Sequence, residues 1–192
     1  MNGTGNLIYL THAEVEIDPL RDITDWPLNE IGRGRHLRFA SDERLARVAA
    51  IYTSTERKSV EGAAPVASHL FLTPTTLVDI GENDRSSTGY LPLEEFEATA
   101  DLFFARPNER VRGWEAASAA QTRIVAAIER INLEHCIGDD LLVVAHGGIG
   151  ALLRCHLLGR EITRDEDQMP GGGCFFMVGR DFKSPPTGWE RI

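Results

Sequence analysis

Short apolar runs alternate along this chain with longer segments in which apolar residues recur at helical spacing. The short runs predict strands at 7–10, 48–52, 69–72, 141–145 and 174–178, with one more around 77–80. The run at 141–145 is continuously apolar, which is typical of a buried parallel strand. Helices are predicted at 32–40, 56–68, 94–105 and 114–131 and from the glycines after His146 to about 158. The helix at 56–68 is expected to kink or break near Pro65.

The order of these elements predicts the fold class. Strands that alternate with helices indicate an α/β protein whose mostly parallel sheet is covered by helices on both faces, a three-layer α/β/α sandwich. The chain shows no internal repeat and no low-complexity tract, and 192 residues are enough for one core. We therefore expect a single domain over residues 1–192.

Composition narrows the range of partners. A net charge of −9 argues against nucleic acid, whose binding proteins carry a basic face. No stretch approaches the roughly 20 apolar residues of a membrane helix, and the N-terminus lacks a signal pattern, so we expect a cytoplasmic protein that neither crosses nor binds a membrane. The three cysteines are too scattered for a disulfide framework or a zinc site. A small molecule is the expected partner, whereas the oligomeric state cannot be read from the chain.

Two predicted strands end in histidine, at His12 and His146. Ligand sites in open α/β sheets lie beyond the carboxyl ends of strands, so both side chains are expected in one crevice. Gly147 and Gly148 let the backbone approach a ligand, and the N-terminus of the following helix favours an anion. A dinucleotide fingerprint is excluded because its third glycine is missing, and no Gly-x-Ser-x-Gly motif supports a serine hydrolase.

Four motifs in order resemble the histidine phosphatase superfamily, the phosphoglycerate-mutase-like proteins. They are LIYLTHAEV, WPLNEIGRGR, IYTSTERKSVEGAAPVA and LLVVAHGGIGALLRCHLLG. They are similar to the family's Arg-His-Gly-Glu strand, its Pro-Leu-Thr-x-x-Gly-Arg helix start, its Ser-Ser and Arg helix, and its second-histidine strand. The matches span about 6–68 and 140–160. The stretch 74–113 is expected to be a divergent insertion that shapes the pocket.

The resemblance implies hydrolysis of a phosphomonoester through a phosphohistidine, without metal or cofactor, with mutase activity less favoured. It implies that His12 attacks phosphorus and that His146 stabilises the transferring group. An acid from the middle of the chain protonates the leaving oxygen. Glu82 fits the family pattern Leu-x-Glu best, with Asp79 and Asp84 as rivals. A general acid there needs a raised pKa.

The chain departs from the family at the phosphate-binding arginines. Thr11 stands where the family has arginine before the first histidine. The second arginine falls at Lys58, with Arg57 one residue out of register, and neither threonine nor lysine gives arginine's two-point grip on phosphate. Arg85 or Arg21 is a candidate to reach in from a loop, and Gly147 supplies backbone N–H. These changes leave a rival hypothesis open: a catalytically impaired relative that binds a phosphorylated or other anionic small molecule.

Overall fold

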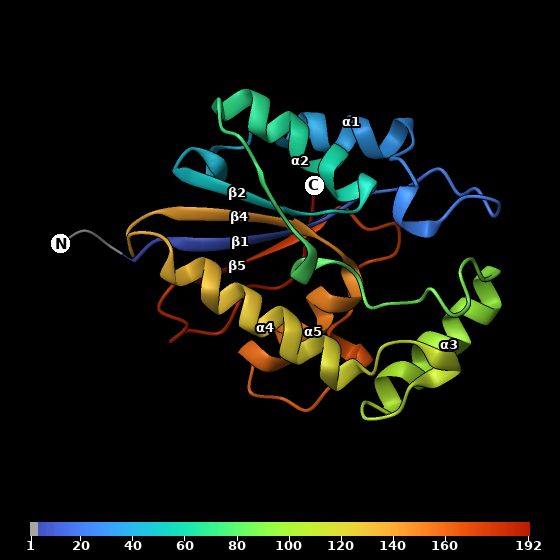
Figure 1. The fold of residues 1–192 in the computed structure, drawn as a ribbon. Helices are drawn as coiled ribbons and strands as arrows, with labels where there is room; N and C mark the ends of the chain where they lie inside the picture. Colours follow the sequence, from blue (N-terminus) through green and yellow to red (C-terminus); the bar gives the residue numbers. More distant parts are fainter. Residues whose placement is uncertain (1–3) are drawn as a thin grey trace.

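A computed structural model describes residues 4–192, and within them six strands form one mixed sheet in the order β3-β2-β4-β1-β5-β6 (Figure 1). The strands are β1 (Asn6–Thr11), β2 (Val48–Ser54), β3 (Thr75–Leu77), β4 (Asp140–Ala145), β5 (Cys174–Gly179) and β6 (Glu190–Arg191). β1, β2, β3 and β4 run parallel, whereas β5 and β6 pair antiparallel. The predicted, mostly parallel sheet is confirmed.

Helices cover both faces of this sheet (Figure 1). On one face lie α1 (Glu30–Phe39) and α2 (Arg57–Leu70), and on the other lie α4 (Ala117–Leu133) and α5 (Gly147–Leu157). The remaining helix, α3 (Leu93–Ala105), lies beyond the sheet, to one side of α5. The three-layer arrangement is therefore confirmed. Among residues 4–192, no helix has both the length and the apolar character that a membrane crossing requires.

Strand alternation divides the core between the two helical layers. In β1, Leu7 and Tyr9 pack in the cluster that contains α4 and α5, whereas Ile8 and Leu10 pack in the cluster that contains α1 and α2. All four side chains are fully buried. Burying one such side chain stabilises a fold by about 1.5–3 kcal/mol, so β1 holds both layers against the sheet. The histidine that follows β1 is consequently placed on a well-anchored strand.

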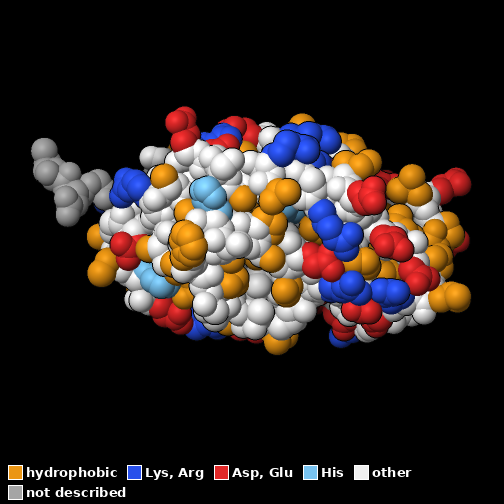
Figure 2. Space-filling model, turned by 90° about the horizontal axis from the view of Figure 1, so that it is seen from above, with side chains coloured by type: hydrophobic (Ala, Val, Ile, Leu, Met, Phe, Trp, Pro, Cys, Tyr) orange, Lys and Arg blue, Asp and Glu red, His pale blue; other side chains and the backbone are white. Residues whose placement is uncertain are grey.

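Charges on the α1–α2 face do not form one basic surface. Figure 2 views this face from above and shows Lys and Arg side chains intermixed with Asp and Glu. Several of them are ion pairs, including Arg33 with Glu61 at 3.0 Å and Arg44 with Asp42 at 2.7 Å. A basic stripe of the kind that tracks a nucleic-acid backbone is not seen on this face.

Three local predictions differ from the structure around α2. The strand predicted at 69–72 was wrong, because His69 and Leu70 form the last turn of α2 and Phe71 ends it in the left-handed region, at φ 55°. A four-residue apolar run does not distinguish a strand from a helix end. α2 continues past Pro65 as one helix, so the expected break is absent. The strand around 77–80 lies earlier, as β3, and a 3-10 turn at Val78–Ile80 follows it.

Helix α1 begins at the predicted cap and packs against the segment that follows His12. Asn29 Oδ1 accepts the N–H of Gly32 at 2.9 Å, which satisfies one of the free donors of the first turn. A Cβ atom added to Gly32 would lie 2.3 Å from the backbone oxygen of Glu14. The absence of a side chain at 32 therefore allows α1 to pack closely against the loop that carries the first histidine.

We expect Gly32→Ala to lower the free energy of unfolding by about 1–3 kcal/mol, because the backbone at Glu14 must move to admit the methyl group. Gly34→Ala is the matched control in the same helix, since a Cβ there comes no closer than 3.4 Å to a flexible Arg38 side chain. It should be neutral or stabilise by up to about 1 kcal/mol through helix propensity. Urea unfolding of both variants measures this, and equal effects would contradict the packing argument.

Candidate active site

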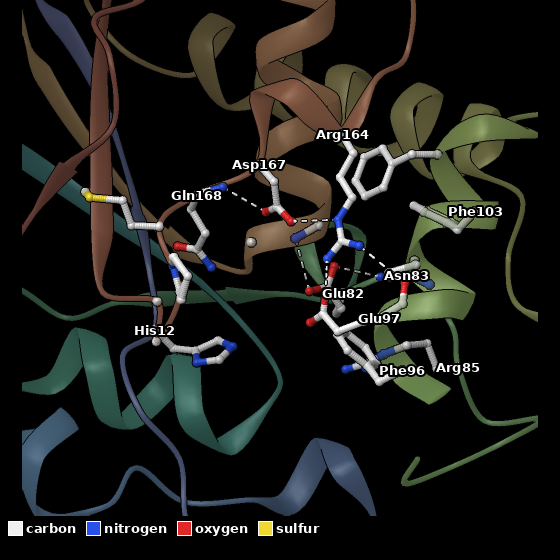
Figure 3. Close-up of a pocket in the computed structure, with 18 of the residues that line it drawn as sticks. His12, Glu82, Asn83, Arg85, Phe96, Glu97, Phe103, Arg164, Asp167 and Gln168 are labelled. Carbon is white, nitrogen blue, oxygen red and sulfur yellow. Dashed lines mark hydrogen bonds and ion pairs between the residues drawn. The ribbon is translucent and has the colours of Figure 1, made fainter. Parts of the chain in front are cut away.

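The two histidines meet because their strands are parallel neighbours. Thr11 of β1 pairs in register with Ala145 of β4, so His12 and His146 follow at the same edge of the sheet. Their ring centroids lie 5.3 Å apart, with the planes at 67°. His12 lines a cavity of about 340 Å³ whose other walls come from α3, the loop at 82–85, the start of α5 and residues 164–172 (Figure 3).

The imidazole of His12 is held in one tautomer. Its Nδ1 lies 2.9 Å from the backbone oxygen of Ala13, which can only accept, so Nδ1 carries the proton. The lone pair is then on Nε2. Burial, followed by the nearby His146 and Lys58, lowers the pKa of His12 well below its usual value. The ring is therefore neutral at pH 7 and has the form that a nucleophile requires.

His146 is fully buried at the start of α5. Its Nε2 lies 2.8 Å from Ser54 Oγ and 3.2 Å from Glu56 Oε1. Its Nδ1 is buried and has no hydrogen-bond partner among residues 4–192. Burial and then the charges of Lys58 and Arg85 lower the pKa of His146 well below its usual value. A buried ring nitrogen without a partner is costly, and a bound ligand is one way to satisfy it.

Of the three candidate acids, Glu82 is the one that lies in the cavity. Its carboxylate accepts the N–H groups of Gly148 at 3.3 Å and Ile149 at 3.2 Å, in the first turn of α5. Burial raises the pKa of Glu82, as a general acid needs. Asp79 points away and pairs with Arg130 at 3.1 Å, with half of its side chain exposed. Asp84 is exposed and accepts the N–H of Ser86.

The basic candidates divide between the interior and the surface. Lys58 is buried, and its Nζ donates to Glu56 Oε2 at 2.5 Å and to the backbone oxygen of Ile23 at 2.7 Å. The carboxylate of Glu56 thus offsets the charge of Lys58. Arg57 is exposed and pairs with Glu61 at 2.8 Å, so it lies outside this group. The other loop candidate, Arg21, is also exposed and pairs with Asp18 at 3.6 Å.

Arg85 differs from the other arginines near the cavity. Its guanidinium lies over the rings of Phe96, at 5.1 Å, and Trp114, at 5.6 Å. Among the described residues it makes no ion pair, and its buried Nε has no hydrogen-bond partner. Asn83 beside it also has a buried amide nitrogen, Nδ2, without a partner in that part of the chain. The segment 74–113 therefore supplies donors and an aromatic wall to the cavity.

Sequence reasoning did not find three polar residues of this region. Glu56 contacts Lys58 and His146, as described above. Gln168 and Arg164 line the cavity from the segment after α5, where Arg164 pairs with Glu97 of α3 at 2.5 Å. No motif marked Gln168 or Arg164, because neither belongs to the four matching segments. Among residues 4–192, no three His, Cys, Asp or Glu side chains are grouped as metal ligands.

The fold and this pair of histidines define a class of proteins, and comparison identifies it. A family model, the histidine phosphatase superfamily (branch 1), matches residues 8–171. The chain belongs to this superfamily. Comparison with curated protein sequences gives no match.

Solved structures of phosphatases share the fold. The mycobacterial glucosyl-3-phosphoglycerate phosphatase superposes with a TM-score of 0.75 at 19% identity, covering 97% of this chain and 96% of that one. The YhfR protein of Bacillus stearothermophilus gives 0.76 at 22% identity, covering 91% and 90%. Phosphoserine phosphatase from Entamoeba histolytica, in complex with 3-phosphoglyceric acid, gives 0.73 at 16% identity, covering 98% of both chains. At these identities the likeness concerns the fold.

Proposed function

We propose that the protein hydrolyses a phosphomonoester through a phosphohistidine on His12. One observation carries this proposal: the bond from His12 Nδ1 to the backbone oxygen of Ala13 leaves Nε2 as the basic nitrogen, beside a cavity that also holds Glu82. A neutral imidazole with one fixed tautomer is a nucleophile at neutral pH. Membership of the histidine phosphatase superfamily supports the same assignment.

The chemistry has two steps. In the first, His12 Nε2 forms a bond to phosphorus while the bond from phosphorus to the ester oxygen breaks, and protonated Glu82 gives its proton to the leaving alcohol. In the second, water attacks the phosphohistidine, Glu82 takes a proton from it, and the nitrogen–phosphorus bond breaks. Inorganic phosphate leaves, and both His12 and Glu82 return to their starting forms.

Charge that develops on the phosphoryl oxygens needs positioned donors. The first N–H of α5, on Gly147, lies beside His12 at the rim of the cavity, where the helix dipole favours an anion. Lys58 lies buried nearby and lowers the pKa of His12 through its charge. A phosphoryl dianion would raise the pKa of His146 and favour its protonated form, whose Nδ1–H then gains a partner.

The cavity indicates a small substrate. Its volume of about 340 Å³ admits a small metabolite but no protein segment of any size. Phe96, Phe103 and Trp114 line the part away from His12, and Arg85 and Asn83 present N–H groups there. We therefore assign the leaving group to this part of the cavity, so that the segment 74–113 determines which ester is accepted.

Hydrolysis of 4-nitrophenyl phosphate by the purified protein, with and without a metal chelator, tests the proposal. We expect saturable release of 4-nitrophenolate at a rate that the chelator does not change, because no step above requires a metal. Release that disappears with the chelator and returns with added metal would contradict the mechanism.

One observation favours a second candidate, a protein that binds a phosphorylated small molecule without turnover. Glu56 offsets the charge of Lys58, and Thr11 is neutral, so the pocket is less cationic than a phosphoryl-transfer site usually is. Saturable binding of inorganic phosphate, together with failure to hydrolyse a panel of aryl and alkyl phosphates, would support this candidate over hydrolysis.

A further inference from the structure

The side chain of Thr11 is buried and reaches a residue on a distant segment. Thr11 Oγ1 lies 2.5 Å from Gln168 Oε1 and accepts the backbone N–H of Cys174 at 3.0 Å. Since the amide of Cys174 can only donate, the hydroxyl proton of Thr11 is available for Gln168. A separation of 2.5 Å is typical of an O–H···O bond and is too short for N–H···O. The oxygen of the Gln168 amide therefore faces Thr11, and its NH₂ group faces the other way.

That NH₂ group lies at the start of α5. A Cβ atom added to Gly147 would be 2.2 Å from Gln168 Nε2, so the amide fills the space beside the helix N-terminus. Gln168 and His12 line the same cavity, and Figure 3 shows Gln168 on the side of the cavity where His12 lies. Within the described chain, Gln168 Nε2 donates to no other residue. Its two N–H groups are free for a ligand next to the first N–H of α5.

We propose that Gln168 is a phosphate-binding residue and that Thr11 is the residue that positions it. The pair replaces a charged grip at the end of β1 with a neutral one: Thr11 fixes the amide, and the amide donates to a phosphoryl oxygen beside Gly147. This inference rests on the proposed function only in placing the phosphoryl group next to His12. The ligand class is an anion with several acceptor oxygens, for which inorganic phosphate serves as the probe.

The segment that carries Gln168 does not depend on the bond to Thr11 for its position. Arg35 donates to the backbone oxygens of Gly172 at 2.9 Å and Gly173 at 2.7 Å, and it pairs with Glu14 at 2.9 Å. These contacts hold residues 171–173 against α1 whether or not the Gln168 amide is present. Loss of the amide should therefore change phosphate binding more than it changes stability.

Titration of inorganic phosphate into the intact chain, followed by calorimetry, tests the proposal. Gln168→Met keeps the size of the side chain and should weaken binding about tenfold or more, the effect of one hydrogen bond to a charged group. Thr11→Val should weaken binding several-fold, and Thr11→Ser, which keeps the hydroxyl, should recover most of the loss. If Thr11 acts through Gln168, the double variant Thr11→Val/Gln168→Met should be no weaker than Gln168→Met alone.

Gln121→Met is the matched control, because Gln121 donates to Leu152 O between α4 and α5, away from the cavity. If Gln168→Met does not fold, Gln168→Glu gives the same test, since an isosteric anion should repel phosphate. Binding by folded Gln168 variants within about twofold of wild type, or no phosphate binding by the wild type, would overturn the inference. Phosphate binding that depends on Gln168 without any ester hydrolysis would instead overturn the proposed function and leave this inference intact.

Discussion

The His12→Ala protein is expected to hydrolyse 4-nitrophenyl phosphate at least about 10⁴-fold more slowly than the wild type, because removal of a covalent nucleophile removes the pathway itself. His12 Nε2 is the basic ring nitrogen at the cavity, since the partner ring of His146 has its Nε2 bonded to Ser54 and Glu56. Steady-state kinetics under identical conditions measure the ratio.

The control for this substitution is His156→Ala, the same change on an exposed residue of α5. It should keep the wild-type rate, and thermal unfolding should show that both variants fold. A His12→Ala rate within about tenfold of wild type would contradict covalent catalysis, because binding and charge stabilisation alone would then account for the activity.

The Glu82→Gln protein is expected to distinguish good leaving groups from poor ones. A general acid contributes about 10²–10⁴-fold, so an alkyl phosphate, whose alkoxide leaves poorly, should lose that factor in rate. 4-Nitrophenyl phosphate should lose little, because 4-nitrophenolate leaves without a proton. Comparison of kcat for the two esters in wild type and variant gives the measurement.

The pH profile of the alkyl ester follows from the same two groups. Activity requires neutral His12 and protonated Glu82. Burial lowers the pKa of His12 well below its usual value near 6.5, so activity is gained as pH rises through that low value. Burial raises the pKa of Glu82, so activity is lost as pH rises through that raised value. The profile should therefore peak at acidic pH, and Glu82→Gln should remove the alkaline limb.

Asp79→Asn is the matched control for Glu82→Gln, because Asp79 belongs to the same stretch but pairs with Arg130 outside the cavity. It should change neither the leaving-group dependence nor the profile. Two results would contradict the role of Glu82: equal losses on both esters, or an Asp79→Asn protein that reproduces the loss.

The location of the site could be predicted from the sequence because it depends on strand ends. The apolar runs before His12 and His146 identify two buried strands, and parallel neighbours place the residues that follow them at one edge. The same logic does not resolve short apolar runs, so 69–72 was taken for a strand where α2 ends.

The electrostatics of the pocket could not be predicted in the same way. The pairing of Lys58 with Glu56 depends on how the turn before α2 places two buried side chains. The contact of Thr11 with Gln168 joins residues that are 157 positions apart. Arg85 reaches the cavity because Phe96 and Trp114, on other elements, hold its guanidinium. Each of these contacts arises from tertiary packing between segments without a shared motif.

The most direct test of the account is to trap the covalent intermediate. Wild-type protein would be mixed with 4-nitrophenyl phosphate and quenched in alkali, in which phosphohistidine survives and serine phosphate esters do not interfere with peptide assignment. Mass spectrometry of the peptides would then locate the phosphoryl group. We predict one phosphoryl group on His12 that is absent from His12→Ala and lost on treatment with acid. Turnover with no phosphoryl group on His12 at any time of quenching, or a phosphoryl group on another residue, would contradict the account.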